Sequence, residues 1–249
     1  MVLAGFEAAL RRFEEAGDAR HACENGVNVG WAYSELGDFA GAEQALREGL
    51  ATAERMGLAS VAAGALHNLG PVLMYLGRTT EAREAELRAI EFFRRQGDRR
   101  LEGLSRAYLA LILIEAGALE EAERAAKMAA GVLEEVPPTR AVALAALGRA
   151  VLDQGKPAEA LAHTSEALAL PVIEERESLL RLVYAESLDQ LGEHDEAREA
   201  IRLAQRRLLE RAAQIREPAW RSSFLGRLPE NARTLQLARE WGVTEEATG

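Results

Sequence analysis

The side chains that most often carry out chemistry are too scattered along this 249-residue chain to form a catalytic or metal site. No two of its four histidines lie within five residues of one another, and none stands at a metal-ligand spacing from Cys23 or from a pair of carboxylates. The histidines are His21, His67, His163 and His194. Adjacent glutamates such as Glu120 and Glu121 fit the charged outer faces of helices. We therefore predict a protein that is not an enzyme, with no catalytic, cofactor-binding or metal-ligating residue and no cofactor.

Composition argues against two further classes of partner. The chain carries 30 basic and 40 acidic residues, a formal net charge of −10, whereas a nucleic-acid binder usually presents a basic face. No apolar run approaches the roughly 20 residues that a membrane span requires. The single Cys23 cannot form an intramolecular disulfide, which fits a reducing compartment. We expect no nucleic-acid or membrane partner and a cytoplasmic location.

A short phrase recurs through the chain and indicates the elements that must position any functional residue. It reads LGDFAGAEQAL from Leu36 and LGEHDEAREAI from Leu191, with three further copies between them. Its glycine recurs at intervals of 40, 40, 38 and 37 residues: Gly37, Gly77, Gly117, Gly155 and Gly192. Self-similarity at this period predicts a solenoid, in which each unit buries its apolar face against its neighbours.

A second set of turn residues divides each repeat into two helices. Gly17, Gly57, Gly97 and Pro137-Pro138 lie about halfway between the recurring glycines. We predict a half repeat at 3–16, followed by helix pairs at 19–56, 59–96, 99–135, 139–170 and 173–216. An array that opens on half a repeat has either a natural capping helix or, as we favour, been cut from a longer protein. Residues 218–249 are expected to cap its last open edge through apolar side chains: Trp220, Phe224, Leu228, Leu235 and Trp241.

Alignment on the turn glycine brings out a register of small residues. Seven positions before it stand Gly30, Gly70, Ala110, Gly148 and Ala185, and five positions after it stands an alanine in every repeat. This register resembles the tetratricopeptide repeat, in the extended form of about 40 residues found in bacterial regulators. HEAT-type repeats share the period but not the register. The C-terminal stretch also resembles the ends of repeat regions in multidomain bacterial signalling proteins. The resemblance implies an all-α, right-handed α-solenoid of antiparallel helix pairs.

The resemblance also implies that the first helix of each pair lines a concave wall where ligands bind. The residues expected there are Val27, Asn28, Trp31, His67, Asn68, Met74, Tyr75 and Leu111. The aromatic and apolar members could anchor a peptide or a helix. The two asparagines occupy equivalent positions and could hold the backbone of an extended peptide. The alternative is that side chains such as Trp31 and Met74 pack between neighbouring repeats.

Three functions remain open from the sequence. The leading interpretation is a non-enzymatic interaction module, the regulatory arm of a bacterial signalling or transcription-control protein. Its partner would be a protein, a peptide or another domain of a larger parent. The alternatives are a sensor for a small molecule or signalling peptide, and a scaffold that associates with itself as a homodimer through its first helix.

Overall fold

The computed structural model describes residues 2–171 and 176–243, and within those ranges the only regular secondary structure is helical. The predicted all-α solenoid is confirmed. The expected start of the last repeat at 173 and the end of the tail at 244–249 lie outside the described residues. The helices in chain order are α1 Val2–Glu15, α2 Ala19–Glu35, α3 Phe39–Met56, α4 Ala59–Tyr75, α5 Thr79–Gln96, α6 Arg99–Glu115, α7 Leu119–Val132, α8 Pro137–Asp153, α9 Pro157–Leu168, α10 Glu177–Gln190, α11 His194–Ala213, α12 Pro218–Arg227 and α13 Pro229–Glu240. No described helix is both long and apolar enough to cross a membrane.

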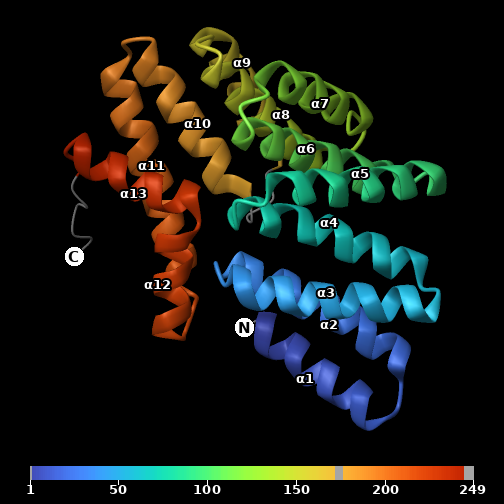
Figure 1. The fold of residues 1–249 in the computed structure, drawn as a ribbon. Helices are drawn as coiled ribbons and strands as arrows, with labels where there is room; N and C mark the ends of the chain where they lie inside the picture. The colour runs from blue at the N-terminus through green and yellow to red at the C-terminus, as the bar shows by residue number, and fades with distance from the viewer. Residues whose placement is uncertain (1, 172–175, 244–249) are drawn as a thin grey trace.

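The helices stack in chain order along an arc, from α1 to α11 (Figure 1). Glycines end the helices because the residue after a helix commonly adopts a left-handed backbone, which glycine reaches without a steric penalty. Gly57 after α3 has φ 68° and Gly97 after α5 has φ 72°. Several helices begin at an aspartate, as at α6, where Asp98 Oδ1 accepts a hydrogen bond from the Leu101 amide at 2.9 Å.

Small residues let the two helices of a repeat pack closely. A Cβ atom added at Gly30 of α2 would lie 2.7 Å from Leu46 Cγ of α3, and one added at Gly148 of α8 would lie 2.8 Å from Thr164 Cγ2 of α9. Such distances are far below ordinary van der Waals contact, so a larger residue would push the helices apart. The glycines in the aligned register are therefore a packing requirement.

The last two helices partly follow the expected capping role. Phe224 and Leu228 pack with Leu208 and Ala212 of α11, and Leu235 lies against the same cluster. Trp241 packs on a separate cluster made by α10, α11 and α13. Trp220 is the exception, because its ring lies 5.9 Å from the ring of Tyr33 in α2. The C-terminal segment therefore also reaches back to the first repeat, which the sequence did not predict.

Candidate binding surface

Two of the predicted wall residues lie in the interior. Val27 is 5% exposed and packs in the first core cluster with Leu46 and Leu69. His67 is 8% exposed, and its Nδ1 lies 2.7 Å from Ser105 Oγ of α6. Both side chains point between helices instead of toward solvent, so the structure removes them from the surface available to a ligand.

The His67 side chain belongs to a buried polar group of three residues from three helices. Glu86 of α5 is fully buried, and its Oε2 lies 3.7 Å from His67 Nδ1, beyond hydrogen-bond distance. Neither carboxylate oxygen has a hydrogen-bond partner among the described residues. Burial raises the pKa of Glu86, with His67 acting in the opposite direction. We call His67, Glu86 and Ser105 the polar trio.

Three other predicted residues are half-buried and pack partly between helices. The Trp31 ring meets the Phe6 ring of α1 edge-on, with centroids 6.4 Å apart. Met74 packs against the first core cluster, and Leu111 packs against a cluster formed around α8. These contacts are those of the packing alternative, although each side chain keeps an exposed part.

The two asparagines differ from those three because they are not packing residues. Asn28 is exposed and Asn68 is half-buried. Neither side chain has a hydrogen-bond partner within the part of the chain that the structure describes. The residue 40 positions after Asn68 is Tyr108, whose hydroxyl contacts Arg176 just before α10. Asn28 and Asn68 occupy the equivalent position of the first two repeats, and we expect them to face the same side of the array.

Tyr75 connects the second repeat to the C-terminal helices. Its ring stacks on Phe39 of α3 with centroids 4.5 Å apart, and its hydroxyl donates a hydrogen bond to Glu230 Oε1 of α13 at 3.4 Å. Burial raises the pKa of Tyr75 well above its ordinary value, and the nearby Glu230 carboxylate acts in the same direction. Its phenol is therefore a hydrogen-bond donor at any physiological pH.

Arg176, just before α10, joins the two ends of the array. Its Nε donates to the Tyr108 hydroxyl at 3.1 Å, and its terminal nitrogen donates to Glu35 Oε1 at 3.1 Å. The guanidinium also lies 5.0 Å from the centroid of the Tyr108 ring. Sequence reasoning missed Arg176 and Glu230 because nothing local marks a contact between residues so far apart. Tyr108 could have been found from its equivalence to Asn28 and Asn68.

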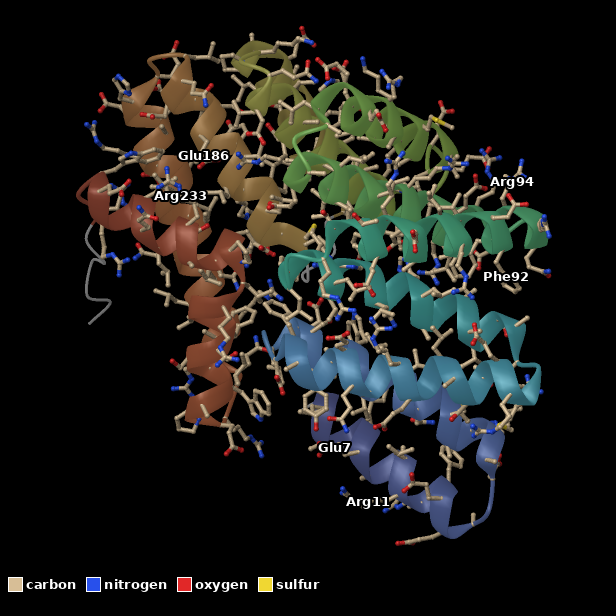
Figure 2. All side chains as sticks on the ribbon, viewed as in Figure 1. Glu7, Arg11, Phe92, Arg94, Glu186 and Arg233 are labelled. Atoms are coloured by element: carbon tan, nitrogen blue, oxygen red, sulfur yellow. The ribbon has the colours of Figure 1, made fainter. Side chains whose placement is uncertain are left out.

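The equivalent helices of the second half of the array carry charged side chains that are paired within the chain. Arg149 of α8 binds Asp153 at 3.1 Å and also pairs with Glu186 of α10. Arg233 of α13 binds Glu186 Oε1 at 3.3 Å, and the two side chains point toward one another (Figure 2). This half of the array is held by internal ion pairs, whereas the first two repeats present unpaired amides.

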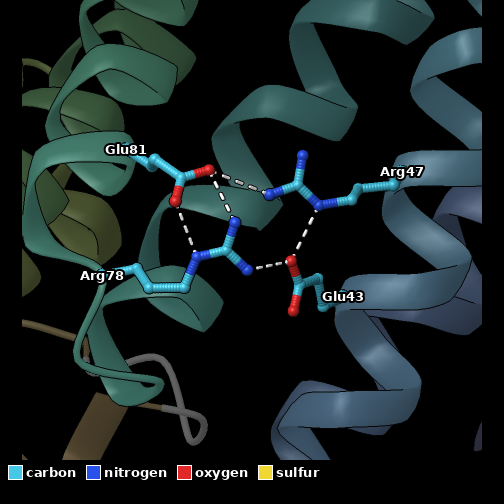
Figure 3. Close-up of polar contacts among 4 residues, drawn as sticks. All are labelled: Glu43, Arg47, Arg78 and Glu81. Carbon is cyan, nitrogen blue, oxygen red and sulfur yellow. Dashed lines mark hydrogen bonds and ion pairs between the residues drawn. The ribbon is translucent and has the colours of Figure 1, made fainter.

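A further ion network joins the first two repeats. Arg47 of α3 binds Glu43 at 2.7 Å and Glu81 of α5 at 3.1 Å, and Arg78 binds Glu81 and also pairs with Glu43 (Figure 3). Hydrogen bonding from Arg47 and Arg78 lowers the pKa of Glu43. All four side chains are partly exposed, so the network is screened by water and salt. Its geometry is that of a link between repeats, and no group of three or more metal-ligating side chains gathers there or elsewhere in the described ranges.

Four segments match family models described as tetratricopeptide repeat: residues 27–56 and 62–95 match one, and 141–164 and 178–202 match another. These segments coincide with helix pairs of the solenoid. The chain carries tetratricopeptide repeats. No curated protein matches it.

Solved structures similar to the array share its fold at low sequence identity. NprR in complex with its cognate peptide NprX has a TM-score of 0.71 at 17% identity, covering 98% of this chain and 69% of NprR. A Rap protein complexed with Competence and Sporulation Factor has a TM-score of 0.65 at 15% identity, covering 96% of this chain and 71% of Rap. BtubC from P. vanneervenii has a TM-score of 0.63 at 17% identity, covering 87% of this chain and 92% of BtubC. At these identities the likeness describes the fold alone.

Proposed function

We propose that the array is a non-enzymatic module that binds a peptide or an extended segment of a partner protein on its concave side. The observation that carries this proposal is the pair Asn28 and Asn68, at equivalent positions of the first two repeats and without partners among the described side chains. An asparagine amide offers both a donor and an acceptor, as an extended peptide backbone requires. Trp31, Met74 and Leu111 would supply apolar contact beside them.

The ligands of two similar folds support the proposal. NprR was solved with its peptide NprX and Rap with Competence and Sporulation Factor, and both arrays are similar to this one over nearly its whole length. By analogy, we place the array in the cytoplasm as the regulatory arm of a bacterial signalling or transcription-control protein. This finer role rests on analogy of fold, whereas the binding site rests on the asparagine pair.

Peptides selected on the immobilised full chain by display would test the site. Removing both amides, as in Asn28→Ala with Asn68→Ala, should weaken the selected peptide about tenfold or more, since each lost hydrogen bond costs about 0.5–1.5 kcal/mol. Gln44→Ala is the matched control, because Gln44 is an exposed amide on α3 that pairs with Glu48. Unchanged affinity in the double variant, measured by fluorescence polarisation, would refute the assignment.

A further inference from the structure

The helix α12 lies against the turn between α2 and α3, about 180 residues earlier in the chain (Figure 1). A Cβ atom added at Gly37 would lie 3.0 Å from the Ser223 carbonyl oxygen and 3.1 Å from Arg227 Cβ. Gly37 is buried, whereas the equivalent turn glycines are exposed and have nothing within 4 Å of such an atom. Those glycines are Gly77, Gly117, Gly155 and Gly192. Of these five turn glycines, only Gly37 lies against α12.

The contacts of α12 resemble those of a helix docked on another protein. Trp220 and Phe224 are four residues apart and so share one face of the helix, and Leu228 follows directly after it in an extended conformation. Trp220 lies on Tyr33, while Phe224 and Leu228 join the cluster that includes Phe39 and Tyr75. We call Tyr33, Gly37, Phe39 and Tyr75 the closure surface. An aromatic pair at this spacing, with Phe224 buried and Trp220 half-buried, is a feature by which one protein recognises a helix of another.

We call the contact of α12 and α13 with the first two repeats the closure. It comprises the aromatic contacts and the hydrogen bond from Tyr75 to Glu230, none of which lies within one helix pair. Arg176, just before α10, adds bonds to Glu35 and Tyr108 that involve no residue of α12. A helix of 10 residues bounded by Pro218 and Pro229 is too short to be stable alone. Its position therefore depends on α11 on one side and on the closure surface on the other.

We propose that α12 is an internal ligand of the closure surface, and that the array takes a partner helix carrying an aromatic pair at positions i and i+4 in its place. This inference rests on the proposed function because it assumes that the array binds a partner. It adds that the partner is a helix and that α12 regulates its binding. Because α12 is tethered through residues 214–217, its effective concentration is high, and a free helix is excluded until the internal contact is weakened.

The probe is a labelled synthetic peptide of residues 216–229, added to the full chain and to two variants. Trp220→Ala removes the internal anchor and leaves the closure surface intact, whereas Trp241→Ala, in the neighbouring cluster of α13, is the matched control. The peptide should bind Trp220→Ala at least tenfold more tightly than it binds wild type or Trp241→Ala. Adding Tyr33→Ala to Trp220→Ala should abolish that gain. Equal affinity for all three chains, or no binding to Trp220→Ala, would overturn the proposal.

Hydrogen exchange in residues 218–227 supplies a second measurement that needs no ligand. Gly37→Ala and Gly77→Ala both place alanine in a left-handed backbone, with φ 77° and 75°, but only the first inserts a methyl group against α12. Exchange in α12 should accelerate at least fivefold in Gly37→Ala relative to Gly77→Ala, and equal rates would contradict the closure. A failed peptide test with a positive asparagine test would reject this inference and leave the proposed function standing. A positive peptide test with a failed asparagine test would support this inference and reject the asparagine site.

Discussion

Glu86 is the residue whose replacement gives the sharpest test of the packing described above. It lies nine residues after its turn glycine, where the other repeats carry Leu46, Ala126, Thr164 and Ile201, all fully buried. His67 likewise stands where another repeat has the buried Val27. The second repeat thus holds a carboxyl group at a position that packing alone would fill with an apolar side chain. We predict that Glu86→Leu stabilises the array.

The size of the expected stabilisation follows from the hydrogen bonds that the Glu86 carboxyl group does not make. Both Glu86 oxygens are buried without a hydrogen-bond partner among the described residues, and Ser105 Oγ, not Glu86, is the atom within hydrogen-bond distance of His67 Nδ1. A buried polar group left without a hydrogen-bond partner costs about 1–3 kcal/mol, and Glu86→Leu should recover a gain of that order. The His67–Ser105 contact survives the change, so no new buried polar atom is orphaned. For a chain of this size, each kcal/mol raises Tm by about 2–4 °C.

The pH dependence of stability tests independently whether Glu86→Leu stabilises the array. Burial raises the pKa of Glu86 above its ordinary value of 4.5, so the folded state retains a proton that the unfolded state has released. Stability should therefore fall as pH rises from about 4.5 through the folded pKa, by at most about 1.4 kcal/mol per pH unit. Glu86→Leu should remove that fall, so its advantage over wild type is larger at pH 8 than at pH 5.

Urea unfolding followed by circular dichroism at pH 5 and pH 8 measures both effects. Glu84→Leu, on the exposed face of the same helix, is the control and should change stability by less than about 0.5 kcal/mol. The reasoning is refuted if Glu86→Leu is no more stable than wild type at pH 8, or if its stability keeps the same slope with pH.

Two further predictions concern the helix ends and the ion network. Asp98→Ala removes the acceptor for the Leu101 amide at the start of α6 and should cost about 1 kcal/mol in urea unfolding, while Asp98→Asn, which keeps an oxygen acceptor, should cost less. Arg78→Ala breaks the network in Figure 3 and should lower Tm in dilute buffer. The loss should vanish near 1 M salt, where the Debye length is about 3 Å, and a loss that persists there would point to packing instead of charge.

The repeat architecture could be predicted because its signals are local and recur. Glycines with positive φ end successive helices, and the small register at Gly30, Gly70 and Gly148 follows from the close approach of paired helices. The turn glycines and the small packing residues each act within about 20 residues, so the same pattern recurs in every repeat of the sequence. The same recurrence exposes exceptions such as Glu86, which could have been recognised as buried from its position alone.

The binding surface was harder to predict because its residues come from distant repeats. An alignment gives the phase of each helix, and from that phase Asn28 and Asn68 are predicted to lie on the inward side. The alignment also assigned the neighbouring residues Val27 and His67 to that side, although both are buried. One step along a helix turns a side chain by about 100°, so a small error in phase changes which side chains are exposed. The contact of Arg176 with Glu35 depends on how far the whole array curves. That curvature is the sum of small rotations between successive repeats, so the sequence of a single repeat does not predict it.

The polar trio and Arg176 meet at one side chain, Tyr108. His67 stacks on its ring with centroids 5.0 Å apart, and Arg176 donates to its hydroxyl while reaching Glu35. Such contiguity alone does not couple two sites, because coupling requires an element with two arrangements that both sites bias. The proposed displacement of α12 would be such an element, but the bonds of Arg176 to Tyr108 and Glu35 involve no residue of α12. Tyr108 therefore links the polar trio to Arg176 by contact alone, and any influence of Glu86 ionisation on Arg176 must act through the position of the Tyr108 ring.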